Sequence, residues 1–196
     1  MDRRAFLAGA VGLALAPRAL AKNVPLALVT ADLESKLVAV ELRDGRPVIE
    51  IDTDAYPRSI ENVGGTAVVA HSELGLVSLV DVFVETRVLA GFGEPRYTVA
   101  DLDQRHAYVT DAKRGEVVVV DVVQGRKVAG VQVGQHARHL SLAPGGRMLW
   151  VALGSKAERV AVVDVSAPAR PRLVRTFAPP FLAHDSASPP TGATRG

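Results

Sequence analysis

Residues 106–122 read HAYVTDAKRGEVVVVDV, in which two runs of β-branched, aliphatic and aromatic residues flank a polar turn. Short apolar runs bounded by turn residues are typical of β-strands. The run at 117–120 consists of four valines without polar alternation, which indicates a strand buried on both faces. Such burial is expected where sheets stack face to face around an axis.

The same pattern recurs along the chain at a nearly constant interval. Its central valines follow one another at steps of 40, 40 and 42 residues: Val29, Val69, Val109 and Val151. The acids that close the second run keep steps of 40, 40 and 43 residues: Glu41, Asp81, Asp121 and Asp164. A period of this length marks repeat architectures, and no helical spacing interrupts the strands. We therefore expect an all-β fold, a β-propeller of four-stranded antiparallel blades with about four blades.

Turn residues such as Asp44-Gly45 and Gly64-Gly65 divide each repeat into four strands, ordered from inner to outer. In the second repeat these strands are predicted at 58–62, 66–71, 76–82 and 87–92. The first repeat lacks its inner strand, because the mature chain enters directly at 26–30. In a closed ring, a strand near 182–186 fills that position.

The first 21 residues have the features of a secretory leader. A basic start precedes an apolar stretch at 6–16, and Ala19-Leu20-Ala21 forms a cleavage site of the small-x-small type. Arg3-Arg4 resembles the twin-arginine signal, and a Sec leader or an uncleaved anchor is the alternative. We expect an export signal at 1–21, propeller repeats at 22–185 and a disordered C-terminal tail at 186–196. The expected location is periplasmic or extracellular.

The net charge and the cysteine count exclude several classes of partner and site. Removal of the leader takes away three arginines and one aspartate, so the mature net charge is near zero. Bulk electrostatics then give no support to a nucleic-acid partner, and no membrane span is expected after cleavage. The absence of cysteine excludes disulfides, thiolate metal sites and a cysteine nucleophile.

The segment Tyr108-Val109-Thr110-Asp111, with the valine run that follows it, closely resembles the signature of the YVTN-repeat β-propeller family. Asp111 stands where that family usually has Asn, and the resemblance extends more weakly over 26–185. It implies an exported propeller, typically of seven blades, with lactonases and nitrite reductases that hold a d-type haem among its relatives in fold. Four repeats are fewer than seven, so a truncated or frameshifted gene is a further hypothesis.

Three arginines occupy equivalent places at the start of inner strands: Arg58, Arg96 and Arg138. In a propeller these positions face the mouth of the central channel, where guanidinium groups bind carboxylates or phosphates through forked hydrogen bonds. The alternative is that each arginine is a copied structural residue that pairs with a nearby acid such as Glu61, Glu94 or Asp101.

His136 and His139 are expected in the same mouth, and His184 near the equivalent loop of the next repeat. These histidines are candidate ligand-binding residues. A metal or haem site is less favoured, because the two side chains of a His-x-x-His pattern at the start of a strand point to opposite faces.

A lactonase-like metal site requires oxygen ligands around a divalent cation, and the candidate ligands are Asn62, Glu61 and Asp101. These three residues are only weak support for such a site. The repeated acids at the ends of the third strands are expected to cap turns. We therefore expect a non-catalytic binding or scaffold protein with no cofactor. Its partner is a small anionic ligand, a peptide or a protein surface, and a homo-oligomer is an open possibility. The alternative is an enzyme or redox accessory, either lactonase-like or haem-associated.

Overall fold

The computed structural model describes residues 25–81, 86–156 and 158–180, which contain fifteen β-strands in four antiparallel sheets. The first sheet comprises β1 (Leu26–Ala31), β2 (Lys36–Glu41) and β3 (Pro47–Asp52). The second comprises β4 (Pro57–Val63), β5 (Thr66–His71), β6 (Leu76–Val80) and β7 (Thr86–Leu89). The third comprises β8 (Pro95–Ala100), β9 (His106–Asp111), β10 (Glu116–Asp121) and β11 (Arg126–Gln132). The fourth comprises β12 (Ala137–Leu142), β13 (Met148–Leu153), β14 (Arg159–Asp164) and β15 (Arg172–Phe177).

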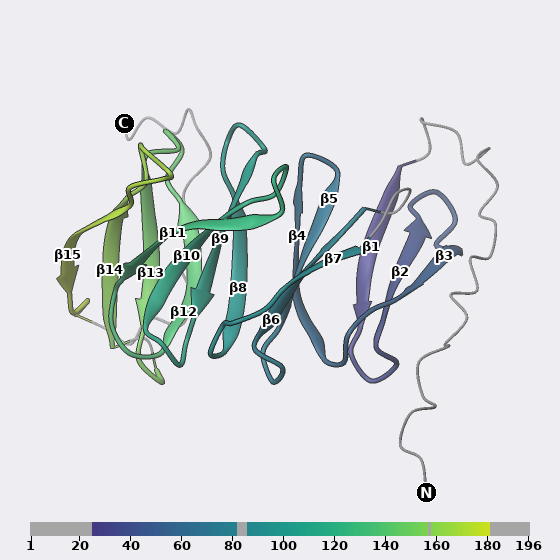
Figure 1. Cartoon of the computed structure of the whole chain (residues 1–196), viewed down its shortest axis with the longest axis horizontal. Helices are drawn as coiled ribbons and strands as arrows, with labels where there is room; N and C mark the ends of the chain where they lie inside the picture. The colour runs from purple at the N-terminus through teal and green to yellow at the C-terminus, as the bar shows by residue number, and fades with distance from the viewer. Residues whose placement is uncertain (1–24, 82–85, 157, 181–196) are drawn as a thin grey trace, which may run out of the picture.

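The four sheets fan out like the blades of a propeller, which confirms the predicted fold class (Figure 1). Chain order within each complete sheet is also spatial order, and β4, β8 and β12 are the inner strands that contact one another. No helix in the described ranges is long and apolar enough to span a membrane.

The core lies between neighbouring sheets, and β10 shows how the sequence produces it. Val117 and Val119 pack with Leu149 and Val151 of the fourth sheet. Val118 and Val120 pack in a separate cluster with residues of the second sheet, including Val68 and Val77. Because neighbouring residues of a strand point to opposite faces, a continuous run of valine buries both faces of one sheet. The prediction made for 117–120 is confirmed.

Two strands of the second sheet end earlier than predicted. The strand β6 ends at Val80, and β7 ends at Leu89 rather than at residue 92. Gly91 has a φ of +80°, which breaks the extended backbone. Beyond it, the Phe92 N–H donates to the carbonyl of Gly75, so the chain has turned toward the β5–β6 loop.

The first sheet has three strands among the described residues, as expected, and there β1 pairs with β2. Val29 is 49% exposed while the equivalent Val69, Val109 and Val151 are all 0% exposed, because none of the described sheets packs against the face of the first sheet that carries Val29. The first and fourth sheets lie at opposite ends of the molecule, so the described residues form an open arc (Figure 1). The segment 182–186, expected to complete the first sheet, lies outside the described residues.

Tight turns between the second and third strands of the repeat share a geometry. Ser35, Gly75 and Gly115 occupy the same place and have φ values of +55°, +64° and +66°. Their carbonyls accept hydrogen bonds from residues just beyond the outer strand of the same repeat: Thr53, Phe92 and Val133. Each turn is therefore hydrogen-bonded to the segment that follows the outer strand of its own repeat.

Two of the four acids expected to cap turns, Asp121 and Asp164, do so, whereas the Glu41 carboxylate lies 3.7 Å from the guanidinium of Arg46. Asp121 Oδ1 accepts from the Gln124 N–H at 2.8 Å, and Asp164 Oδ1 accepts from the Ser166 N–H and hydroxyl. These contacts confirm turn capping at Asp121 and Asp164, which agrees with the behaviour of aspartate in loops.

Candidate functional site

The three equivalent arginines lie at the same structural irregularity. The pairing register shifts between Pro57 and Ser59 in β4, between Pro95 and Thr98 in β8, and between Ala137 and Leu140 in β12. Arg58, Arg96 and Arg138 fall within these shifts. A β-bulge adds one residue to a strand and changes where its side chains point, and such bulges are frequent beside binding sites.

In the third sheet the bulge is held by a buried hydroxyl. Arg96 and Tyr97 together oppose Thr110, whose Oγ1 accepts from the Tyr97 N–H at 3.1 Å. Thr110 is fully buried, so this hydrogen bond is shielded from water. The equivalent positions Ala70 and Ala152 lack a hydroxyl, and the third sheet therefore has the best-supported bulge of the three.

A hollow of about 330 Å³ brings Arg58 and Arg96 together. We call it the arginine pocket; residues from three successive sheets line it, among them Thr30, Asp32, Arg58, Ser72, Arg96 and Tyr97. Its volume lies at the lower end of the range for small-molecule sites. Arg138 does not line this pocket, so the structure brings two of the three predicted arginines together there.

Both arginines of the pocket contact carboxylates. Arg58 Nη1 lies 3.2 Å from Asp32 Oδ2, and Arg96 Nη2 donates to Glu94 Oε1. Two polar atoms of these ion pairs, Asp32 Oδ1 and Arg96 Nε, nevertheless have no hydrogen-bond partner within the described residues, although solvent does not reach them. A buried polar atom without a partner costs about 1–3 kcal/mol, so binding of a matching group at either atom is favoured.

An aromatic contact extends the wall of the arginine pocket toward the fourth sheet. Tyr97 lines the pocket, and its ring stacks against the imidazole of His139 on β12. Arg138, the residue before His139, is half-buried and forms no ion pair in the part of the chain that the structure describes. His139 and Arg138 are thus neighbours of the pocket that come from the next inner strand.

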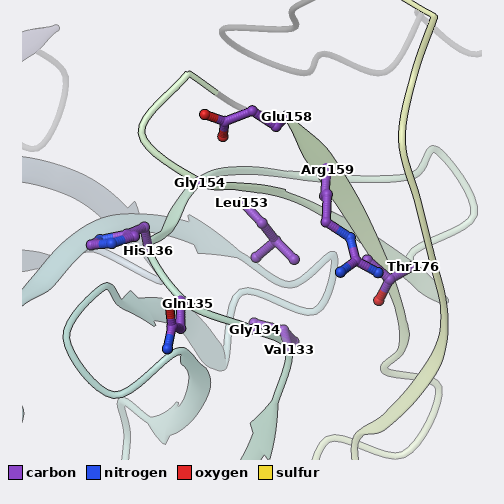
Figure 2. Close-up of a pocket in the computed structure, with 9 residues that line it drawn as sticks. All are labelled: Val133, Gly134, Gln135, His136, Leu153, Gly154, Glu158, Arg159 and Thr176. Atoms are coloured by element: carbon purple, nitrogen blue, oxygen red, sulfur yellow. The ribbon is translucent and has the colours of Figure 1, made fainter.

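His136 lies in different surroundings. It borders a second hollow, of about 380 Å³, together with Gln135, Leu153, Glu158, Arg159 and Thr176. Figure 2 shows its imidazole pointing away from the guanidinium of Arg159. The pKa of Glu158 is lowered, chiefly by hydrogen bonds from backbone N–H groups of its own loop. The predicted site residue His184 lies outside the described residues.

The acids considered for a metal site have other contacts. Asp101 accepts from the backbone N–H groups of Arg105 and His106, and its Oδ2 lies 2.7 Å from His106 Nδ1. Burial alone raises the pKa of Asp101, but these hydrogen bonds outweigh burial and lower it. For Glu61, burial raises the pKa of the carboxyl. Within 25–81, 86–156 and 158–180, no three His, Asp or Glu side chains gather as metal ligands.

The sequence analysis identified neither Tyr97 nor Asp32 as a site residue. The signal for Tyr97 was its position directly after Arg96 at the start of an inner strand. For Asp32 no local signal existed, because its partner Arg58 is 26 residues away on another sheet.

Comparison with solved structures supports the fold. No protein-family model matches the sequence, and no curated protein matches it. Hydrazine synthase of Kuenenia stuttgartiensis superposes with a TM-score of 0.68 at 18% identity, over 78% of this chain and 46% of that one. The Cps50 (Swd1) β-propeller domain of Myceliophteria thermophila gives 0.64 at 18% identity, over 78% and 55%. A functionally unknown protein of Desulfotomaculum acetoxidans gives 0.65 at 13% identity, over 81% and 57%. The chain therefore spans about half the length of these structures.

Proposed function

We propose that this protein is an exported, non-catalytic propeller of the YVTN-repeat type that binds a small ligand with an anionic group in the arginine pocket. The signature around Tyr108 and the leader-like residues 1–21 support the family and the export. The location that follows from the proposal is the periplasm or the cell exterior. A peptide or protein surface that presents a carboxylate satisfies the same chemistry.

The observation that carries this proposal is the pairing of two bulge arginines in one hollow. Arg58 and Arg96 come from different sheets, yet both line the same space. The Nε of Arg96 has no partner there, and a guanidinium presents its N–H groups in a planar fork that matches a carboxylate or phosphate. Because Thr110 holds the backbone of the Arg96 bulge, the place from which the Arg96 side chain extends is fixed before a ligand arrives.

The test is a titration of the purified, processed protein with small carboxylates and phosphate, followed by calorimetry. We expect Arg58→Gln and Arg96→Gln to weaken binding by about tenfold or more, since hydrogen bonds to charged groups contribute about 1.5–3 kcal/mol. Arg172→Gln is the matched control, because Arg172 is an exposed arginine that pairs with Asp164 on the fourth sheet. Equal affinity in all four proteins would refute the proposal.

The alternative proposal is a lactonase-like enzyme or a haem-associated accessory, and metal analysis and a visible spectrum of the same purified protein distinguish it from the non-catalytic proposal. The alternative predicts a stoichiometric divalent metal or a Soret band in the visible spectrum. Detection of either overturns the non-catalytic proposal. Arg138, His136 and His139 remain candidate binding residues in the proposal, and single alanine variants at each position measure their part in affinity.

A homo-oligomer is also proposed, with a second copy of this chain as the partner of the first sheet. The face of the first sheet that carries Val29 has no neighbouring blade in the arc, and apolar surface of this kind favours association. A second copy of this chain packed against that face would cover Val29. Native mass spectrometry tests this: a strictly monomeric protein at micromolar concentration contradicts it.

A further inference from the structure

Carboxylates offset the charge of the two arginines that line the arginine pocket. Arg58 is paired with Asp32, which also lines the pocket, and Arg96 is paired with Glu94, which does not line it. A ligand that carried only negative charge would gain from the guanidinium groups but would also approach the Asp32 carboxylate. Such like-charge proximity reduces affinity. The charge balance instead favours a ligand with charges of both signs.

The two unpartnered atoms require different chemistry. Arg96 Nε is a donor and needs an acceptor, which a ligand carboxylate supplies. Asp32 Oδ1 is an acceptor and needs an N–H or O–H donor, which no carboxylate or phosphate dianion supplies. The Asp32 and Arg96 side chains are 37% and 32% exposed, although these two atoms are not, so contact of a ligand with either atom requires its side chain to rotate.

The remaining wall restricts the size and character of the ligand. The hydroxyl of Ser72 is already bound to the carbonyl of Pro95 at 2.6 Å, so Ser72 shapes the wall and contributes no free donor. Tyr97 offers aromatic surface on one side of the hollow, since it lines the pocket while it stacks on His139. A volume of about 330 Å³ suits a molecule of amino-acid to dipeptide size.

We infer that the ligand of the arginine pocket is a small zwitterion of this size, with a carboxylate held by Arg96 and Arg58 and an ammonium group held by Asp32. This inference rests on the proposed function and narrows it from an anion to an α-amino acid or a short peptide. The existing ion pairs hold the four charged side chains close to their binding positions, which reduces the entropy lost when a ligand binds.

The experiment is a thermal-shift screen of the full-length processed protein against the twenty L-amino acids and a set of dipeptides, followed by calorimetry. The best ligand is then compared with its analogue without the amino group and its analogue without the carboxylate. For phenylalanine these are 3-phenylpropionate and 2-phenylethylamine. We expect the parent zwitterion to bind at least tenfold more tightly than either analogue.

Two variants test which side chain binds which charged group of the ligand. Asp32→Asn keeps the shape of the side chain and removes its charge, so it should abolish the preference for the zwitterion over the analogue without the amino group. Arg96→Gln should abolish the preference over the analogue without the carboxylate. Asp164→Asn is the control and should leave both preferences unchanged, because Asp164 lies on the fourth sheet, pairs with Arg172 and does not line the arginine pocket.

The outcomes separate this inference from the proposed function. If the analogue without the amino group binds as tightly as its parent, the inference is wrong and the anion-binding proposal stands. If the best ligand is the amine without a carboxylate, or if amino acids, dipeptides, small carboxylates and phosphate all fail to bind, both are wrong.

Discussion

The ring of Tyr97 lies against the imidazole of His139, with the two centroids 3.8 Å apart and the planes inclined by 35°. Each residue belongs to the bulge of an inner strand, β8 for Tyr97 and β12 for His139. The contact therefore joins the third and fourth sheets beside the arginine pocket, at the point where the bulges turn side chains out of the regular strand alternation.

We predict that this ring contact couples the two sheets. Each of Tyr97→Ala and His139→Ala should destabilise the protein, and a double-mutant cycle should give a coupling of about 0.5–1.5 kcal/mol, the range for aromatic pairs beyond area burial. Urea denaturation of the four proteins measures it. A coupling near zero would show that the rings are neighbours without energetic interaction.

Replacement of Asp111 by alanine should cost much more stability than replacement of Asp164. Asp111 is fully buried and accepts hydrogen bonds from the backbone N–H groups of Gly93, Glu94 and Arg114. The variant leaves these donors without a partner, with an expected loss of about 3 kcal/mol or more in the free energy of unfolding. Chemical denaturation checks both variants, and a similar loss of stability in Asp164→Ala, where the native side chain is 17% exposed, would contradict the account.

The tight turns predict a second stability difference, between Gly115→Ala and Gly45→Ala. Both glycines have positive φ, of +66° and +71°, so an alanine at either position is strained by about 1–2 kcal/mol. At Gly115 a Cβ atom would also lie 2.7 Å from the carbonyl oxygen of Gly134, whereas nothing lies within 4 Å at Gly45. We therefore expect Gly115→Ala to lower the melting temperature clearly more than Gly45→Ala. Equal melting temperatures would refute the steric contribution.

Tyr108 predicts the behaviour of the protein in alkali. Burial, with smaller contributions from the charges of Asp101 and Asp103, raises the pKa of Tyr108 to about 12. The unfolded chain ionises near pH 10, so the stability that depends on neutral Tyr108 is complete below pH 10 and is lost as the pH rises through about 12. Tyr108→Phe should remove this pH dependence between pH 10 and 12.

The measurement for Tyr108 is urea denaturation at a series of pH values, with phenolate absorbance followed in parallel. Tyr56→Phe, at an exposed tyrosine, is the control and should keep the alkaline loss of stability. If Tyr108→Phe loses stability with pH as steeply as the parent, another group is responsible.

The fold was predictable because its two determinants are local. The valine runs and their constant interval identify strands buried on both faces, and β10 buries Val117 to Val120 as expected. The end of β7 was not predictable, because Gly91 adopts its positive φ in a loop whose path depends on the hydrogen bond between Phe92 and Gly75.

Only the arginines of the site were predictable from the sequence. Arg58 and Arg96 occupy equivalent positions in their repeats, which predicts that both lie at the start of inner strands. Their partners were not predictable, because these depend on packing between sheets. Asp32 approaches Arg58 from another blade, and the bulge at Arg96 shifts the alternation that a strand pattern assumes for Tyr97. An extra residue in a strand changes which side chains share a face, and no composition rule reveals where that residue sits.

The position of Asp32 at the end of β1 links ligand binding to local order. Asp32 is the first residue after β1, and within the described residues β1 is hydrogen-bonded along one edge, whereas β5, β9 and β13 are paired along both, so the amide hydrogens of β1 should exchange with solvent faster than those of β5, β9 or β13. A molecule that engages Asp32 binds only while this strand is in place. Ligand binding in the arginine pocket should therefore slow deuterium uptake in β1 and leave the uptake of β5, β9 and β13 unchanged. Deuterium uptake in β1 would then report whether the ligand is bound.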